Sequence, residues 1–197
     1  APNFYDDNKE IKIPLDPTKT ARENSQKYFD RYGKLKRTAE ALDTLLAETK
    51  AEIDHLESIQ NSLDIALSAD DLVQIKQELM EYGFIKKHRT GKKEKVKSKP
   101  FHYISSDGYD MYVGKNNYQN DELTFKFATG NDWWFHAKGM PGSHVVVKNK
   151  GEEMPDRVYE EAAMLAGYYS KGRESDKIEI DYLQKKNVKK PAGSAPG

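Results

Sequence analysis

The residues best suited to chemistry lie in one stretch of sixteen, DWWFHAKGMPGSHVVV (132–147). Asp132, His136 and His144 are of the types that bind iron or zinc, and a histidine can also act as a general acid or base. On a strand, Asp132 and His136 would share a face because they are four positions apart. The stretch contains no HExxH motif or other close ligand spacing. A metal-dependent hydrolase built on these three residues is therefore kept only as an alternative.

The same stretch holds both tryptophans of the chain, which suits contact with RNA. Strand alternation would place Trp133 and Phe135 on an exposed surface, where aromatic rings can stack on nucleobases. His136 and His144 are further candidates for that surface. In the other interpretation Trp133, Trp134 and Phe135 are core residues, because large aromatic side chains dominate small cores. The sequence leaves both interpretations open.

The net charge of zero conceals two halves of opposite sign. Residues 1–83 carry a net charge of −6 and residues 84–197 a net charge of +6. A basic half suggests a polyanion as its partner. The chain has no cysteine, which excludes disulfides and cysteine-ligated zinc. Basic residues beyond position 100 that could contact phosphates are Lys115, Lys126, Lys138, Lys148, Lys171, Arg173, Lys185, Lys186, Lys189 and Lys190.

The segment KKHRTGKKEKVKSKP (86–100) carries eight lysines and arginines against Glu94 alone. It has few apolar residues and ends in proline, so we interpret it as a flexible basic linker. It could contact phosphates or serve only as a solvated hinge. Its candidate RNA-binding residues are Lys86, Lys87, Arg89, Lys92 and Lys93.

The segment SDGYDMYVGKNNYQNDELT (106–124) combines a turn signal with a helix start. Asp107 and Gly108 suit a hairpin turn. Asn116 or Asn117 could cap a helix whose N-terminus, near Lys115, binds an anion, or could simply be a cap. The spacing fits neither an EF-hand nor a phosphate-binding loop.

The segment before the linker, 1–85, is predicted to be a short hairpin followed by one arm of a coiled coil. Thr20 and Glu23 have capping-box spacing at a helix start. Two apolar series then recur every seven residues, and such a seam needs a partner helix. We expect that partner upstream of Ala1; without it, the chain should self-associate through the seam. The series are Tyr28, Leu35, Leu42, Thr49, Leu56 and Leu63, and Tyr32, Ala39, Leu46, Ile53, Gln60 and Leu67.

A second, shorter helix is expected from Ala69 to Tyr82, with Ser68 and Asp71 at its start and Gly83 closing it. Residues 101–197 read as mixed strands and helices. Strand-like runs lie on either side of SDG, the segments WWFHA, HVVVK and KIEIDYL are strand-like too, and Pro155 should open a helix. The fold class predicted for the chain is α+β, a long coiled-coil helical arm followed by a compact α/β domain.

The motifs of this second part resemble the RNA-binding domain of the NFACT family of ribosome quality-control factors, whose bacterial members are also labelled fibronectin-binding protein A-like. The resemblance extends over nearly the whole chain, because IPLDPTKTARENSQKYFDRYGKLK is similar to the returning arm of the family's middle coiled coil. The matching motif residues are Asp107, Gly108, Tyr112, Val113, Gly114, Asn120, Asp121, Leu123, Thr124, Asp132, Trp134, Phe135, His136, Pro141, Gly142, Ser143, His144 and Val145.

The resemblance implies a C-terminal piece of a factor that binds obstructed large ribosomal subunits and tRNA. Such a factor supports alanine tailing of stalled chains and reaches the ribosomal stalk base with its coiled coil. It implies no cofactor, no membrane association, a cytoplasmic location and no conventional enzyme activity. For this piece we expect RNA contacts by Trp133, His136, His144, Lys115 and the linker, with Asn116, Asn117 and Lys138 as further candidates. The competing class is a fibronectin-binding adhesin, displayed at the cell surface, that pairs through a strand edge.

Overall fold

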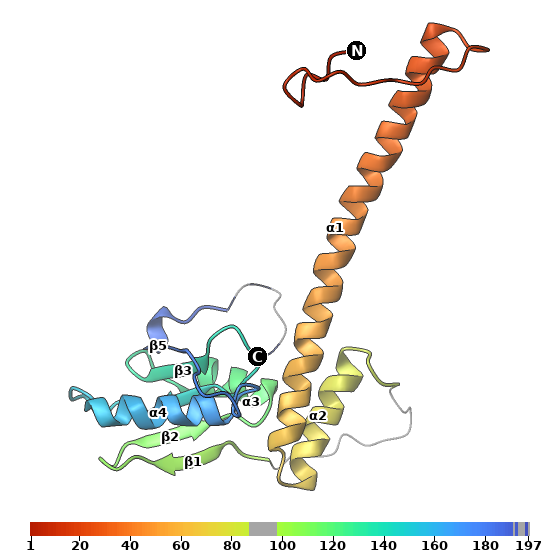
Figure 1. Cartoon of the computed structure of the whole chain (residues 1–197). Helices are drawn as coiled ribbons and strands as arrows, with labels where there is room; N and C mark the ends of the chain where they lie inside the picture. The colour runs from red at the N-terminus through yellow and green to blue at the C-terminus, as the bar shows by residue number, and fades with distance from the viewer. Residues whose placement is uncertain (87–97, 191, 193–195, 197) are drawn as a thin grey trace. The chain divides into compact units, whose positions relative to one another are not determined.

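The computed structural model in Figure 1 describes residues 1–86, 98–190, 192 and 196. The predicted linker therefore lies largely outside the described residues, and with it the candidates Lys87, Arg89, Lys92 and Lys93. Among the described helices, none has both the length and the apolar character that crossing a membrane requires.

The first of two units, Ala1–Ala51, opens with a short hairpin. Pro2 and Glu10 form an antiparallel bridge, and Asp7 and Asn8 take φ angles of +45° and +56° in the intervening turn. Asp and Asn tolerate this left-handed conformation because their short side chains can hydrogen-bond locally. The predicted hairpin is confirmed, with a single bridge in place of two full strands.

Helix α1 (Ala21–Ile65) begins at the predicted capping box. The Thr20 N–H donates to the Glu23 carboxylate (2.8 Å), and the Glu23 N–H donates to Thr20 Oγ1 (3.3 Å). These bonds satisfy donors that a first helical turn leaves unpaired. The long helix is thus confirmed, whereas self-association remains a prediction. Seam side chains exposed in this unit are Tyr28, Tyr32, Leu35, Leu42 and Leu46.

The second unit, Glu52–Gly197, contains the end of α1 and helix α2 (Ala69–Glu81). Ser68 and Asp71 form a reciprocal capping box at the start of α2, as predicted. Gly83 follows the helix with φ of +79°, a conformation that favours glycine and ends helices. The buried apolar side chains of the two helices are Ile59, Ile65 and Ile75.

A five-stranded antiparallel sheet forms the centre of the second unit (Figure 1). Its strand order is β1-β2-β4-β3-β5, so that β1 and β5 are the edge strands. The turn predicted at Asp107 and Gly108 joins β1 to β2, and Gly108 has φ of +78°. The strands are β1 (Phe101–Ile104), β2 (Asp110–Val113), β3 (Trp133–Ala137), β4 (Val145–Val147) and β5 (Ile180–Gln184).

Helix α4 (Asp156–Tyr168) packs on one face of this sheet, against β2, β3, β4 and β5. Its expected apolar face is confirmed, because Val158, Ala162 and Ala166 are fully buried. The helix begins at Asp156 with Pro155 as its N-cap, one position later than expected. Sheet residues in the same core are Met111, Val113, Phe135, Val145 and Val147.

The opposite face of the sheet is partly covered by α3 (Asn117–Glu122) and the π-helix η1 (Leu123–Phe127). Thr124 of η1 hydrogen-bonds His144 beside β4, and Phe127 contacts the ring of Tyr112 on β2. A helix was predicted here, but its change to π-helix was not. The short 3-10 helix η2 (Lys185–Asn187) follows β5. The whole arrangement confirms the α+β class.

Candidate nucleic-acid interface

Trp134, His136 and His144, here called the histidine cluster, lie together on the sheet face opposite α4. The Trp134 and His136 rings are stacked at 5.7 Å, and the His144 ring meets each of them edge-on at 5.1 and 5.3 Å. His144 is 7% exposed, and its Nδ1 lies 2.8 Å from Thr124 Oγ1. The cluster therefore joins β3 and the start of β4 to η1.

The two imidazoles of the cluster are poor phosphate ligands. Burial, with a smaller contribution from the neighbouring His136, lowers the pKa of His144 to about 3. Burial also lowers the pKa of His136. Both rings are consequently neutral near pH 7, and His144 has almost no surface with which to touch RNA. His136 is half-buried, and RNA binding by either residue stays a prediction.

Asp132 lies apart from the histidine cluster. Its carboxylate accepts hydrogen bonds from the N–H groups of Thr129 (2.6 Å) and Asn149 (2.9 Å) and from Lys148 Nζ. Burial alone would raise the pKa of Asp132, but these hydrogen bonds outweigh it and lower the pKa. Within the described residues no group of three acidic, histidine or cysteine side chains could hold a metal. The hydrolase alternative thus lacks its ligand set.

Asn116 and Asn117 are buried and act as structural residues. Asn116 caps α3 by accepting from the Gln119 N–H (3.0 Å), and its amide donates to Gln74 Oε1 (2.6 Å). The Asn117 amide donates to Glu78 Oε1 (2.7 Å). Both amides are engaged inside the protein, which supports the plain-cap interpretation for Asn116, while RNA contact by either residue stays a prediction.

Lys115 likewise interacts inside the protein, in an ion pair with Asp71. Its Nζ lies 3.2 Å from Asp71 Oδ1 and 4.6 Å from the centre of the Phe101 ring, and the side chain is mostly buried. Burial would raise the pKa of Asp71, but hydrogen bonds from Ser98, Ser68, a backbone N–H and Lys115 lower it to about 2. Lys115 therefore neutralises a buried carboxylate, and its expected role in RNA binding stays a prediction.

The remaining aromatic candidates are buried or half-buried. Phe135 is fully buried, so the expectation of exposure was wrong for this ring. Trp133 is half-buried and meets Tyr159 of α4 edge-on at 4.9 Å. Trp134 is half-buried too, with its Nε1 enclosed and without a partner among the described residues.

Of the basic candidates, Lys86 and Lys138 are exposed, and Lys138 pairs with Glu179 at 3.1 Å.

Several motif residues are needed for close packing. A Cβ on Gly114 would lie 2.1 Å from Asn120 Oδ1, which accepts the His144 N–H. A Cβ on Gly142 would lie 3.0 Å from Ser170. The motif residues Pro141 and Ser143 flank Gly142, and Ser143 is buried. Of the motif aspartates, Asp107 is exposed and Asp121 forms an ion pair with Lys190.

Four lysines lie beside two phenyl rings on and around η1; Lys126 is exposed, while Lys148, Lys185 and Lys190 are half-buried. Lys148 and Lys190 also form ion pairs with Asp132 and Asp121. Lys185 and Lys190 place their ammonium groups 5.7 and 6.0 Å from the centre of the Phe125 ring. Lys148 lies 4.8 Å from the centre of the Phe127 ring, and Lys126, between the two phenylalanines in the sequence, is exposed. We call these six residues the η1 surface. The four lysines were noted in the sequence only as phosphate contacts, and the two phenylalanines were not singled out.

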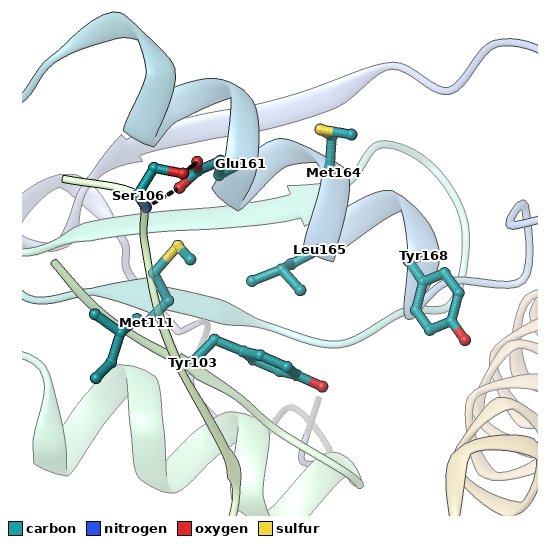
Figure 2. A pocket seen from close by; sticks show the side chains of 8 residues that line it. Tyr103, Ser106, Met111, Glu161, Met164, Leu165 and Tyr168 are labelled. Carbon is teal, nitrogen blue, oxygen red and sulfur yellow. Dashed lines mark hydrogen bonds between the residues drawn. The ribbon is translucent and has the colours of Figure 1, made fainter. Parts of the chain in front are cut away.

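A separate apolar groove of about 440 Å³ lies between β1 and α4 (Figure 2). Glu161 closes one end by accepting a hydrogen bond from the Ser106 N–H (2.9 Å) and another from its hydroxyl. Within the described residues, no strand pairs with the outer edge of β1. The other lining residues are Tyr103, Ile104, Met111, Met164, Leu165 and Tyr168.

The chain matches relatives of known type along nearly all of its length. It is 43% identical over 196 residues to the Rqc2 homolog RqcH of Streptococcus pneumoniae and 37% identical over 199 residues to that of Bacillus subtilis. Each alignment covers 99% of this chain but only 35% and 34% of the relative. This chain thus spans about a third of the length of these relatives.

A shorter relative and a solved structure are also similar to this chain. Coiled-coil domain-containing protein 25 of Bos taurus is 31% identical over 94 residues, which is 45% of each chain. A solved structure of the C-terminal part of the fibronectin/fibrinogen-binding protein from Streptococcus suis superposes with a TM-score of 0.80 at 42% identity. That superposition covers 92% of this chain and 72% of the other.

Two family descriptions divide the chain between them. The NFACT N-terminal and middle domains match residues 1–98, and the NFACT protein RNA binding domain matches residues 99–196. The division falls inside the segment interpreted as a linker. With the long helix and the antiparallel sheet in place, these matches show that the chain belongs to the NFACT family and ends in its RNA-binding domain.

Proposed function

We propose that the chain contributes RNA contacts to a cytoplasmic ribosome quality-control factor, and that the η1 surface makes those contacts. The observation that carries the proposal is the placing of lysine ammonium groups beside half-exposed phenyl rings at Phe125 and Phe127. Lysines neutralise phosphates while aromatic rings offer a face to nucleobases, and RNA-binding surfaces combine the two. Membership in the NFACT family, with an RNA-binding domain over residues 99–196, supports the same function.

The relatives support the proposed role of the intact factor. RqcH-like factors of 37–43% identity support a role in ribosome quality control. We further propose that the intact factor binds obstructed large subunits at rRNA and a stalk-base protein, binds tRNA, and supports alanine tailing. Because this chain spans about a third of its relatives, those steps also depend on the remaining two thirds of such a factor.

The proposed function is tested by binding of the chain to purified large ribosomal subunits and to tRNA across a salt series. The test variant is Lys126→Glu/Lys185→Glu. The control, Arg157→Glu/Lys177→Glu, makes the same charge change at two exposed positions outside the η1 surface. Each lost phosphate contact should reduce the slope of log K against log salt by about 0.7–0.9. We expect weaker binding and a shallower slope in the test variant only.

The proposal fails in two distinguishable ways. If the folded wild-type chain binds neither subunits nor tRNA at low salt, this part of the factor has no RNA-contacting role. If the control variant loses as much affinity as the test variant, binding follows net charge and the η1 surface has no special part in it.

A second candidate function is capture of an extended segment of fibronectin at β1. The Ser105 N–H donates to the Tyr109 carbonyl (2.8 Å). Bonding alternates along an antiparallel pair, so the peptide groups of His102 and Ile104 point away from β2. A segment could add to this edge and place apolar side chains in the groove of Figure 2. The similar structure from Streptococcus suis is described as a fibronectin/fibrinogen-binding protein, which favours testing it.

The test compares fibronectin binding by Ile104→Lys with binding by Ile13→Lys, since both isoleucines are exposed but only Ile104 lies in β1. A charged side chain at the strand edge discourages pairing. Strand addition predicts a loss confined to Ile104→Lys. Unaltered binding in that variant, or no binding by the wild type, would rule out this edge.

A further inference from the structure

Three aromatic rings form a row on the sheet face opposite α4. His102 of β1 stacks on Tyr112 of β2, with centroids 4.6 Å apart and planes 10° from parallel. Phe127 of η1 meets Tyr112 edge-on at 4.7 Å. His102 and Tyr112 are register partners, and Tyr112 pairs in turn with Val146 opposite Trp134. We call this row the ring ledge.

The ring ledge is open to solvent at both ends. The side chain of His102 is 46% exposed and Phe127 is 41% exposed, while Tyr112 between them is half-buried. The residues of the α4 core do not include these three rings.

The charges beside the ledge favour an anionic ligand. Lys148 lies 4.8 Å from the centre of the Phe127 ring, and Lys126 precedes Phe127 in η1 and is exposed. Lys148 is partly neutralised by Asp132. Among the described residues, the carboxylate that contacts a ring of the ledge is Asp110, whose Oδ1 lies 2.7 Å from His102 Nε2. That contact lies at the His102 end of the ledge, whereas the exposed Lys126 is adjacent in sequence to Phe127, the ring at the other end.

We infer that the ring ledge stacks unpaired nucleobases, so that this domain prefers single-stranded to double-stranded RNA. The inference rests on the proposed function and gives it a ligand class. Bases within an A-form duplex are already stacked on one another, and their faces are closed to protein rings. Unpaired bases can stack on aromatic side chains while the adjacent lysines hold the phosphates. The ledge and the η1 surface share Phe127, and Lys148 lies beside that ring, so the two surfaces are continuous there.

The experiment measures binding of a labelled oligouridylate and of an RNA duplex of equal length, by fluorescence anisotropy across a salt series. The test variants are His102→Ala, at the exposed sheet edge, and Phe127→Leu, which keeps apolar bulk but removes the ring. Tyr168→Ala is the matched control, because Tyr168 is exposed on α4, on the other side of the sheet. Thermal unfolding confirms that each variant is folded.

We expect the wild type to bind the single strand more tightly than the duplex. Each ledge variant should bind the single strand about tenfold more weakly with an unchanged salt slope, because it loses a stacking contact and no phosphate contact. Tyr168→Ala should bind as the wild type does. Lys126→Glu/Lys185→Glu should instead reduce the slope.

The contrary results separate the inference from the function on which it rests. If the ledge variants bind the single strand as the wild type does while the lysine variant loses affinity, the ledge is not a stacking site but RNA binding stands. Equal binding of single strand and duplex by the wild type also overturns the inference. If the wild type binds neither RNA at low salt, the proposed function falls and the ledge inference with it.

Discussion

The histidine cluster and the η1 surface use similar residue types in opposite ways. In the cluster, Trp134, His136 and His144 pack against one another, and burial keeps the imidazoles neutral. On the η1 surface, lysines lie over phenyl rings that remain partly exposed. The cluster therefore joins strands to a helix, whereas the η1 surface is proposed to bind RNA. A sequence motif rich in aromatic and histidine residues can therefore have a structural role, while the proposed binding surface lies beside it.

The largest expected effect contrasts two phenylalanines, one in each region. Phe135→Ala removes a fully buried ring from the core and should lower the free energy of unfolding by about 3–5 kcal/mol. Phe127→Ala removes a ring that is 41% exposed and should cost about 1 kcal/mol or less. Urea unfolding of both variants measures the difference. Equal losses would show that the η1 surface is part of the core.

A somewhat smaller loss is expected from Gly114→Ala. The added methyl group would lie 2.1 Å from Asn120 Oδ1 and 2.9 Å from the Asn120 backbone nitrogen, so that the start of α3 has to move. Overpacking of this kind costs about 1–3 kcal/mol. Gly139→Ala, at an open position but with φ of +66°, serves as the comparison for backbone strain alone. An unchanged melting temperature in Gly114→Ala would contradict the close packing.

The sequence predicted the elements well because their signals are local. The capping pairs Thr20–Glu23 and Ser68–Asp71, and the turn at Gly108, depend on neighbours within a few positions. The burial of individual site residues could not be predicted from the sequence, because burial depends on distant partners. The buried Asn117 amide donates a hydrogen bond to Glu78, which is thirty-nine positions away, and the Lys115 ammonium group donates one to Asp71. The π-helix at η1 also escaped prediction, since its residues read as an ordinary helix.

Stability should fall with acidity because of His144. Its folded pKa is about 3, below the value of about 6.5 expected in the unfolded chain. The unfolded chain therefore binds the proton more readily, so the contribution is complete above about pH 6.5 and is lost progressively as pH falls toward 3. The lowered pKa of His136 acts in the same direction. Urea unfolding at about pH 7 and about pH 5 should show a smaller difference in His144→Gln than in the wild type. The same pH dependence in both would count against a neutral buried ring.

The smallest effect is expected from Lys138→Glu. Lys138 is exposed, pairs with Glu179 at 3.1 Å and lies outside the η1 surface. Exposed ion pairs contribute little, so the free energy of unfolding should stay within experimental error of the wild type. Affinity for oligouridylate should change less than it does in Lys126→Glu/Lys185→Glu. A larger loss in Lys138→Glu would move the RNA contact to the far end of β3.

The most direct test of the central claim is the salt dependence of binding to purified large ribosomal subunits for two folded variants, His136→Ala and Lys126→Glu/Lys185→Glu. The division of roles described above predicts that His136→Ala keeps the wild-type slope, while the lysine variant binds more weakly with a shallower slope. The opposite pattern, a loss in His136→Ala with wild-type binding by the lysine variant, would place the RNA contact in the histidine cluster and contradict the assignment to the η1 surface.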